Sequence, residues 1–69
     1  MRLSARNQLP GVVTKLEHGA VMSTVVVRLA GGDEITAAIT KDSAEELGLA
    51  VGDAVTAIVK STEVMIGRE

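Results

Sequence analysis

The middle of the chain carries the pattern that most restricts its fold. Residues 30–34, Ala-Gly-Gly-Asp-Glu, form a turn-type sequence. Apolar residues occupy every second position on both sides of it: Val25, Val27 and Leu29 before it, and Ile35, Ala37 and Ile39 after it. Period-two alternation is typical of strands that bury one face. The sequence therefore predicts a β-hairpin over residues 21–40.

The length of the loop sets the register of this hairpin. A two-residue loop of Gly31 and Gly32 places Leu29 opposite Glu34, which mixes apolar and charged faces. A three-residue loop over residues 31–33 keeps the apolar faces together through three pairings: Leu29 with Ile35, Val27 with Ala37, and Val25 with Ile39. Because a one-residue slip moves every side chain to the opposite face, we predict the three-residue loop, with a glycine in the left-handed conformation.

The residues before the hairpin predict a strand that is broken in two. Pro10 and Gly11 interrupt the stretch over residues 3–16, because proline cannot donate to a strand ladder and glycine favours a bend or bulge. The expected pieces cover residues 3–9 and 12–17.

The residues after the hairpin predict one helix and two strands. A short helix is expected over residues 40–48, because Asp42 or Ser43 fits a capping box and Gly48 fits the position just after a helix. The two strands are expected over residues 54–60 and 64–66.

This order of elements predicts an all-β fold: a small Greek-key barrel, similar to the oligonucleotide/oligosaccharide-binding (OB) fold, of about five strands with one short helix. At 69 residues, the chain is expected to form a single domain over residues 1–69. A chain of this length has a small core. Because it contains no cysteine and one histidine, neither a disulfide nor a Cys/His metal site can stabilise that core. With 46% apolar residues, association with copies of itself is predicted.

The composition also narrows the function. Nine acidic and seven basic residues, with no Phe, Tyr or Trp, provide neither a field that attracts nucleic acid nor rings that stack on bases, so we expect no nucleic-acid partner. No apolar run has the length of a signal-peptide core or a membrane span, so we expect a cytoplasmic protein without a membrane partner. With no cysteine nucleophile and no serine beside an evident base, we expect no enzymatic activity.

Two clusters of hydrogen-bond donors lie near the ends of the chain. They are Ser4, Arg6, Asn7 and Gln8 at the start of the first strand, and Lys60, Ser61 and Thr62 after an apolar strand. Hydroxyl, guanidinium, ammonium and carboxamide groups can converge on an oxyanion; the alternative is two polar strand ends in water. Ser43, at the start of the expected helix, adds N–H groups and a helix dipole that favour an anion.

Several segments along nearly the full length of the chain match one known family. They are Ser4-Ala5-Arg6-Asn7-Gln8-Leu9, Ala38-Ile39-Thr40 with Ser43, Leu47-Gly48-Leu49, Gly52, and Val59-Lys60-Ser61-Thr62 with Val64-Met65-Ile66. Together they resemble the molbindins, small molybdate- and tungstate-binding proteins. The resemblance implies a homohexamer built as a trimer of dimers, with molybdate or tungstate held at subunit interfaces for intracellular storage or homeostasis. It implies no direct ligands for a metal cation.

The resemblance also implies the site residues. The oxyanion is expected to lie against Ser4, Ala5 and Arg6 of one subunit, with Lys60 and Ser61, and with Thr40 and Ser43 from the neighbouring subunit. A second kind of site near a threefold axis is expected at His18, Gly19, Ala20 and Val21. For His18, the alternative is a surface residue of a turn.

Two other functions stay open. Residues 47–55 also resemble the corresponding turn of swapped-hairpin DNA-binding transcriptional regulators, which use a basic N-terminal face. This chain offers Arg2 and Arg6 there without a basic cluster. The other alternative is an assembly module without a ligand, whose thermal stability would not respond to any oxyanion.

Overall fold

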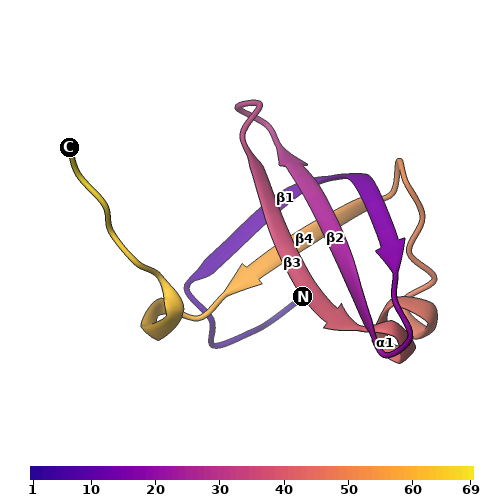
Figure 1. Cartoon of the computed structure of the whole chain (residues 1–69). Helices are drawn as coiled ribbons and strands as arrows, with labels where there is room; N and C mark the ends of the chain where they lie inside the picture. Colours follow the sequence, from indigo (N-terminus) through magenta and orange to yellow (C-terminus); the bar gives the residue numbers. More distant parts are fainter.

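The computed structural model describes all 69 residues, which form four antiparallel strands, one short helix and one 3₁₀ turn. In chain order these are β1 (Asn7–His18), β2 (Met22–Leu29), β3 (Glu34–Thr40), α1 (Lys41–Glu46), β4 (Ala54–Val59) and η1 (Ser61–Glu63). The strands form one sheet in the order β3-β2-β1-β4, which curls into a half-barrel (Figure 1). The predicted all-β fold with one short helix is confirmed, with four strands in the sheet. No helix is long and apolar enough to cross a membrane.

β1 is one continuous strand, so the predicted break at Pro10 and Gly11 is wrong. The reason lies in the direction that Pro10 faces. Val13 exchanges backbone hydrogen bonds with Gly52 and Asp53 on the β4 side, at 2.8 and 3.0 Å. Because backbone groups alternate in direction along a strand, Pro10 faces the opposite side, where the pairing with β2 has already ended at Gly11. Its missing N–H therefore removes no ladder hydrogen bond.

Gly11 is where β1 passes from one partner strand to the other. The first part of β1 pairs with β4 and the second with β2, and Gly11 and Val12 pair with both. A Cβ atom at Gly11 would lie 2.5 Å from the carbonyl oxygen of Arg28 and 2.6 Å from Cγ1 of Val27. Only glycine permits this close approach. A bulge between Val13 and Lys15 adds to the curvature, and together they turn the sheet into a half-barrel.

The hairpin of β2 and β3 confirms the predicted faces but not the predicted register. The structure pairs Val27 with Ile35, Val25 with Ala37, and Ser23 with Ile39. The backbone N–H of Leu29 donates to the carbonyl of Asp33 at 2.8 Å, which leaves a three-residue loop of the predicted length that begins one residue earlier, at Ala30. The register therefore shifts by two residues and each side chain stays on its face. Gly32, with φ of 96°, takes the left-handed position.

The core of the half-barrel is small and open. Val13, Val25 and Val27 are buried, and a ring of half-buried residues packs against them: Leu16, Leu29, Ile35, Ile39, Leu49 and Val55. In all, five of the 69 residues are buried. The apolar faces predicted for β2 and β3 point inward, yet most of their side chains are only partly buried.

Two local predictions near the helix and the C-terminus need correction. The N-cap of α1 is Thr40, rather than Asp42 or Ser43, because the Thr40 hydroxyl accepts the backbone N–H of Ser43. Gly48, with φ of 61°, ends the helix as predicted. The strand expected over residues 64–66 does not form: beyond η1 the chain runs on without a partner strand (Figure 1).

Candidate functional site

The two donor clusters predicted near the chain ends meet at one end of the sheet. β1 and β4 are antiparallel, and Asn7, the first residue of β1, pairs with Val59, the last residue of β4. The residues just before β1 therefore lie beside the residues just after β4. We call this group the Arg6–Lys60 end; it comprises Ser4, Ala5, Arg6, Lys60 and Ser61.

Two carboxamides hold the backbone of this end in place. The Nδ2 of Asn7 donates to the carbonyl of Val59 at 3.2 Å, and the Nε2 of Gln8 donates to the carbonyl of Ala5 at 2.9 Å. The sequence pattern predicts Asn7 and Gln8 as donors for an anion. The structure instead uses them to link β1 to β4 and to fix the segment before β1.

The charged groups of the Arg6–Lys60 end have no partner of opposite charge. The ion pairs of the molecule join Lys15 with Glu17, Arg28 with Glu34, and Lys41 with Glu45, all on other parts of the surface. Arg6 and Lys60 are exposed and unpaired, and no side-chain hydrogen bond engages the hydroxyls of Ser4 and Ser61. Two cations and two hydroxyls thus remain available to an anion at one place.

The remaining predicted site residues lie at the other end of the sheet. Met22, at the start of β2, pairs with Thr40 at the end of β3. The backbone N–H of Lys41 donates to the carbonyl of Val21 at 2.7 Å, which ties the turn before β2 to the start of α1. We call this group the His18–Ser43 end; it comprises His18, Gly19, Ala20, Val21, Thr40 and Ser43.

The hydroxyls of Thr40 and Ser43, at the His18–Ser43 end, already make hydrogen bonds within the chain. The Thr40 Oγ1 accepts the backbone N–H of Ser43 at 3.0 Å and donates its own hydrogen to the Ser43 Oγ at 2.7 Å. The hydroxyl hydrogen of Ser43 is left free, on an exposed side chain. The Nδ1 of His18 lies 2.6 Å from the Oγ of the buried Ser23, so that contact orients the exposed imidazole.

The two ends cannot meet within one chain. They are joined by β1, whose first and last residues, Asn7 and His18, are eleven positions apart. A strand of this length keeps its two ends well apart even where it bends, in a molecule whose longest dimension is 35 Å. Figure 1 shows α1 and η1 on opposite sides of the half-barrel. One ion could therefore contact both ends only if they came from different subunits.

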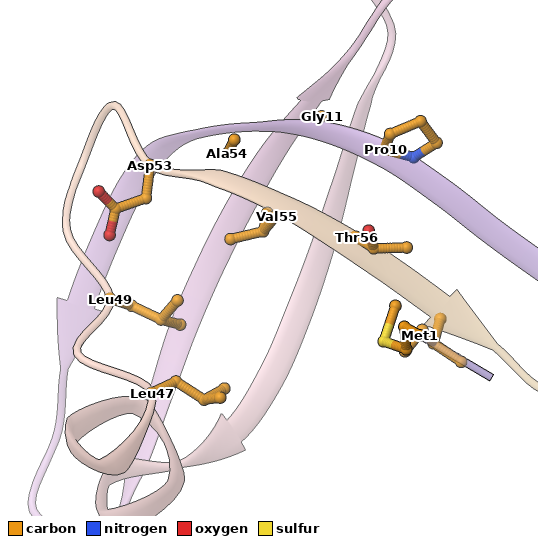
Figure 2. A pocket seen from close by; sticks show the side chains of 10 residues that line it. Met1, Pro10, Gly11, Leu47, Leu49, Asp53, Ala54, Val55 and Thr56 are labelled. Carbon is orange, nitrogen blue, oxygen red and sulfur yellow. The ribbon is translucent and has the colours of Figure 1, made fainter. Parts of the chain in front are cut away.

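The structure offers no cluster of metal ligands, and the hollow shown in Figure 2 is unsuited to an anion. Nowhere do three His, Cys, Asp or Glu side chains gather to hold a metal ion. The hollow in Figure 2, about 720 Å³, is lined mainly by apolar side chains of β4 and of the loop after α1, with Met1 across from them. The charged side chain among them, Asp53, is an acceptor for the backbone N–H of Ala50 at 2.9 Å and would repel an anion.

Comparisons with known proteins agree with the fold. Residues 3–66 match the TOBE domain family. The chain is 54% identical to molybdenum-pterin-binding protein 2 of Clostridium pasteurianum, over 96% of this chain and 97% of that protein.

Two solved structures superpose over nearly the whole chain. MopII from Clostridium pasteurianum has a TM-score of 0.93 at 52% identity, covering 97% of this chain and all of that one. A molybdate-binding protein from Sporomusa ovata has a TM-score of 0.92 at 43% identity, covering 99% and 100%. These matches confirm the OB-like architecture and the resemblance drawn from the sequence. The chain therefore belongs to the TOBE domain family and, within it, to the Mop-type molbindins.

Proposed function

We propose that this chain binds molybdate or tungstate at interfaces between subunits of a homo-oligomer, a homohexamer arranged as a trimer of dimers. In this role it stores or buffers the oxyanion in the cytoplasm and catalyses no reaction. The main support is the pair of unpaired cations, Arg6 and Lys60, which the sheet brings together beside the free hydroxyls of Ser4 and Ser61. The names of its relatives refer to molybdenum-pterin or molybdate binding.

The donor set suits a tetrahedral dianion. Such an ion accepts hydrogen bonds at every oxygen and needs a surrounding that is rich in donors and free of carboxylates. Arg6 can present two parallel N–H groups to two oxygens, and Lys60 adds a point charge. Ala5 contributes no side-chain donor and leaves its backbone beside the ion. The net charge of −2 does not oppose binding, because nearby donors rather than the distant field hold the ion.

A second subunit would complete this site. In the single chain Ser4, Arg6, Lys60 and Ser61 are all exposed, so water competes for every donor. Excluding water strengthens each hydrogen bond to an anion. Thr40 and Ser43 of a neighbouring chain are proposed to cover the ion and to supply the free hydroxyl of Ser43. The second kind of site is proposed at the turn formed by His18, Gly19, Ala20 and Val21.

The experiment is a calorimetric titration of the purified protein with molybdate and tungstate, with sulfate and phosphate as controls. The proposal predicts saturable heat with the first two ions and a mass in solution several times that of one chain. At an ion concentration of about 100 times Kd, binding adds about 2.7 kcal/mol of stability per site. An oligomer that gives no heat with any of these ions would overturn the proposal and leave an assembly module.

A further inference from the structure

Ser23 is a polar residue on the inward, apolar face of β2. Val25 and Val27 follow it on this face, and all three side chains are buried. Ser23 is 1% exposed and is the only polar residue among the five buried ones. A buried hydroxyl is unfavourable unless it makes a hydrogen bond. Ser23 therefore needs a hydrogen-bond partner at this position.

The imidazole of His18 is that partner. His18, the last residue of β1, pairs directly with Ser23, and its Nδ1 lies 2.6 Å from the Ser23 Oγ. On the other side, Ser23 pairs with Ile39 of β3, whose side chain has no polar atom. The structure gives the hydroxyl no other hydrogen bond. A buried group thus holds one side of an otherwise exposed ring.

This contact decides which ring nitrogen carries the hydrogen of the neutral imidazole. The hydroxyl of Ser23 has one hydrogen to donate, and Nδ1 of His18 is the only acceptor within reach. If Nδ1 carried the hydrogen, it would donate to the Oγ, and the hydroxyl hydrogen would stay buried without an acceptor, which is unfavourable. The hydroxyl therefore donates to Nδ1, and the ring hydrogen lies on Nε2.

The Nε2–H group is directed away from Ser23, toward solvent at the turn that joins β1 to β2. In this turn the backbone N–H of Gly19 donates to the carbonyl of Met22 at 2.7 Å, whereas the N–H groups of Ala20 and Val21 donate to no backbone carbonyl. An oxyanion accepts hydrogen bonds from such groups, and a ring with a bare Nε2 would present a lone pair to it instead. The turn therefore suits an anion only with the hydrogen on Nε2.

We propose that Ser23 is a positioning residue for the second oxyanion site. It holds the imidazole of His18 with the hydrogen on Nε2, so that the ring donates to an oxyanion beside the free N–H groups of Ala20 and Val21. Ser23 itself does not touch the ion. The role of Ser23 rests on the second site of the proposed function, and it gives His18 a task that a surface residue of a turn would not have.

The first test is an NMR measurement of the ring nitrogens, which is unambiguous because the chain has one histidine. At mildly alkaline pH, the nitrogen chemical shifts of the wild type should show the hydrogen on Nε2. Ser23→Ala should introduce the other tautomer, and Ser23→Thr, which keeps the hydroxyl, should restore the wild-type shifts. Thr24→Ala is the matched control, because it removes an exposed hydroxyl from the opposite face of β2. Hydrogen on Nδ1 in the wild type, or equal shifts in Ser23→Ala and the wild type, would overturn the inference.

The second test is a molybdate titration of Arg6→Ala/Lys60→Ala, which lacks the cations of the first site and so reports on the turn. The Nε2 signal should shift to saturation. Ser23→Ala in the same background should weaken this binding roughly 2- to 10-fold, about the value of one neutral hydrogen bond, and Thr24→Ala should leave it unchanged.

The outcomes of the titration separate the two proposals. Saturable heat in the wild type without any shift of the Nε2 signal would overturn the role of Ser23 and His18 and leave the first site standing. No heat with any oxyanion in the wild type would refute the proposed function and, with it, the role of Ser23.

Discussion

The Arg6–Lys60 end and the His18–Ser43 end differ in how much of their hydrogen bonding the fold itself consumes. At the first end, carboxamides fix the backbone, and the cations and hydroxyls are left without partners. At the second end, Thr40 uses its hydroxyl to cap α1, and His18 contacts Ser23. The first end is therefore equipped to attract an anion, while the second provides fewer free groups on a firmly held frame.

This difference assigns different tasks to the two ends of one proposed site. Charge and most donors come from Arg6 and Lys60, and closure against water comes from Thr40 and Ser43 of a neighbour. Substitutions at the first end should therefore weaken binding and leave folding nearly unchanged. Substitution of Thr40 at the second end should affect both, because its hydroxyl also caps the helix.

The largest effect is expected from removing both cations of the first end. Arg6→Ala/Lys60→Ala deletes two charge-assisted contacts worth about 1.5–3 kcal/mol each, so molybdate affinity should fall at least roughly 100-fold. Thermal unfolding should change little, because both side chains are exposed and unpaired. Lys15→Ala is a control for the loss of an exposed lysine outside this end, since Lys15 lies in the middle of β1 and pairs with Glu17. Calorimetry showing unchanged affinity in the double variant would refute the site.

Gly11→Ala should destabilise β1, the strand that joins the two ends. Its Cβ atom would overlap the carbonyl oxygen of Arg28, which belongs to the backbone and cannot move aside without shifting β2. The expected loss of unfolding free energy is about 1–3 kcal/mol or more. Denaturant titration measures it, and Gly31→Ala is the control because nothing lies within 4 Å of that position. Equal stability of the two variants would contradict the role given to Gly11.

Thr40→Ala should reduce both stability and binding. It removes the acceptor for the Ser43 N–H at the start of α1, and loss of such a cap costs about 1 kcal/mol. Helix α1 packs the buried Ala44 against the sheet, so weakening the helix should lower the melting temperature of the whole chain. Thr40→Ser keeps the hydroxyl and should restore most of the stability. A Thr40→Ala variant as stable as the wild type would refute the capping role.

Ser43→Ala should have the smallest effect and should separate binding from capping. The Thr40 hydroxyl still accepts the backbone N–H of residue 43, so the melting temperature should change little. The free hydroxyl hydrogen is lost, and a neutral hydrogen bond is worth about 0.5–1.5 kcal/mol, so anion affinity should fall about 2- to 10-fold. Unchanged affinity would show that Ser43 does not face the ion.

Local sequence patterns predicted the faces of the fold better than its registers. The alternation around Val25 and Ile35 predicted the inward faces correctly, because period two is a local property. The predicted loop began one residue too late. The predicted and observed registers differ by two residues and share the same faces, so only backbone hydrogen bonds decide between the two registers. Pro10 misled the prediction, because the sequence does not show which side of a strand lacks a neighbour.

The residue pattern alone predicted the candidate site as a set of donor types, and its arrangement was expected only from the family resemblance. The sequence placed donors before β1 and after β4, and antiparallel pairing of Asn7 with Val59 brings them together. It did not separate Asn7 and Gln8, which hold the backbone, from Arg6 and Lys60, which remain free. That distinction depends on hydrogen bonds between segments far apart in the chain, such as Asn7 to Val59.

The central claim is that one oxyanion site takes its two halves from different chains, and a mixing experiment tests it most directly. One variant, Arg6→Ala/Lys60→Ala, keeps an intact His18–Ser43 end; the other, Thr40→Ala/Ser43→Ala, keeps an intact Arg6–Lys60 end. Each alone should bind molybdate weakly. After the two are mixed equally and reassembled, random pairing gives about a quarter of the sites two intact halves, so calorimetry should recover that fraction of tight binding. No recovery in mixed oligomers would contradict a site shared between chains.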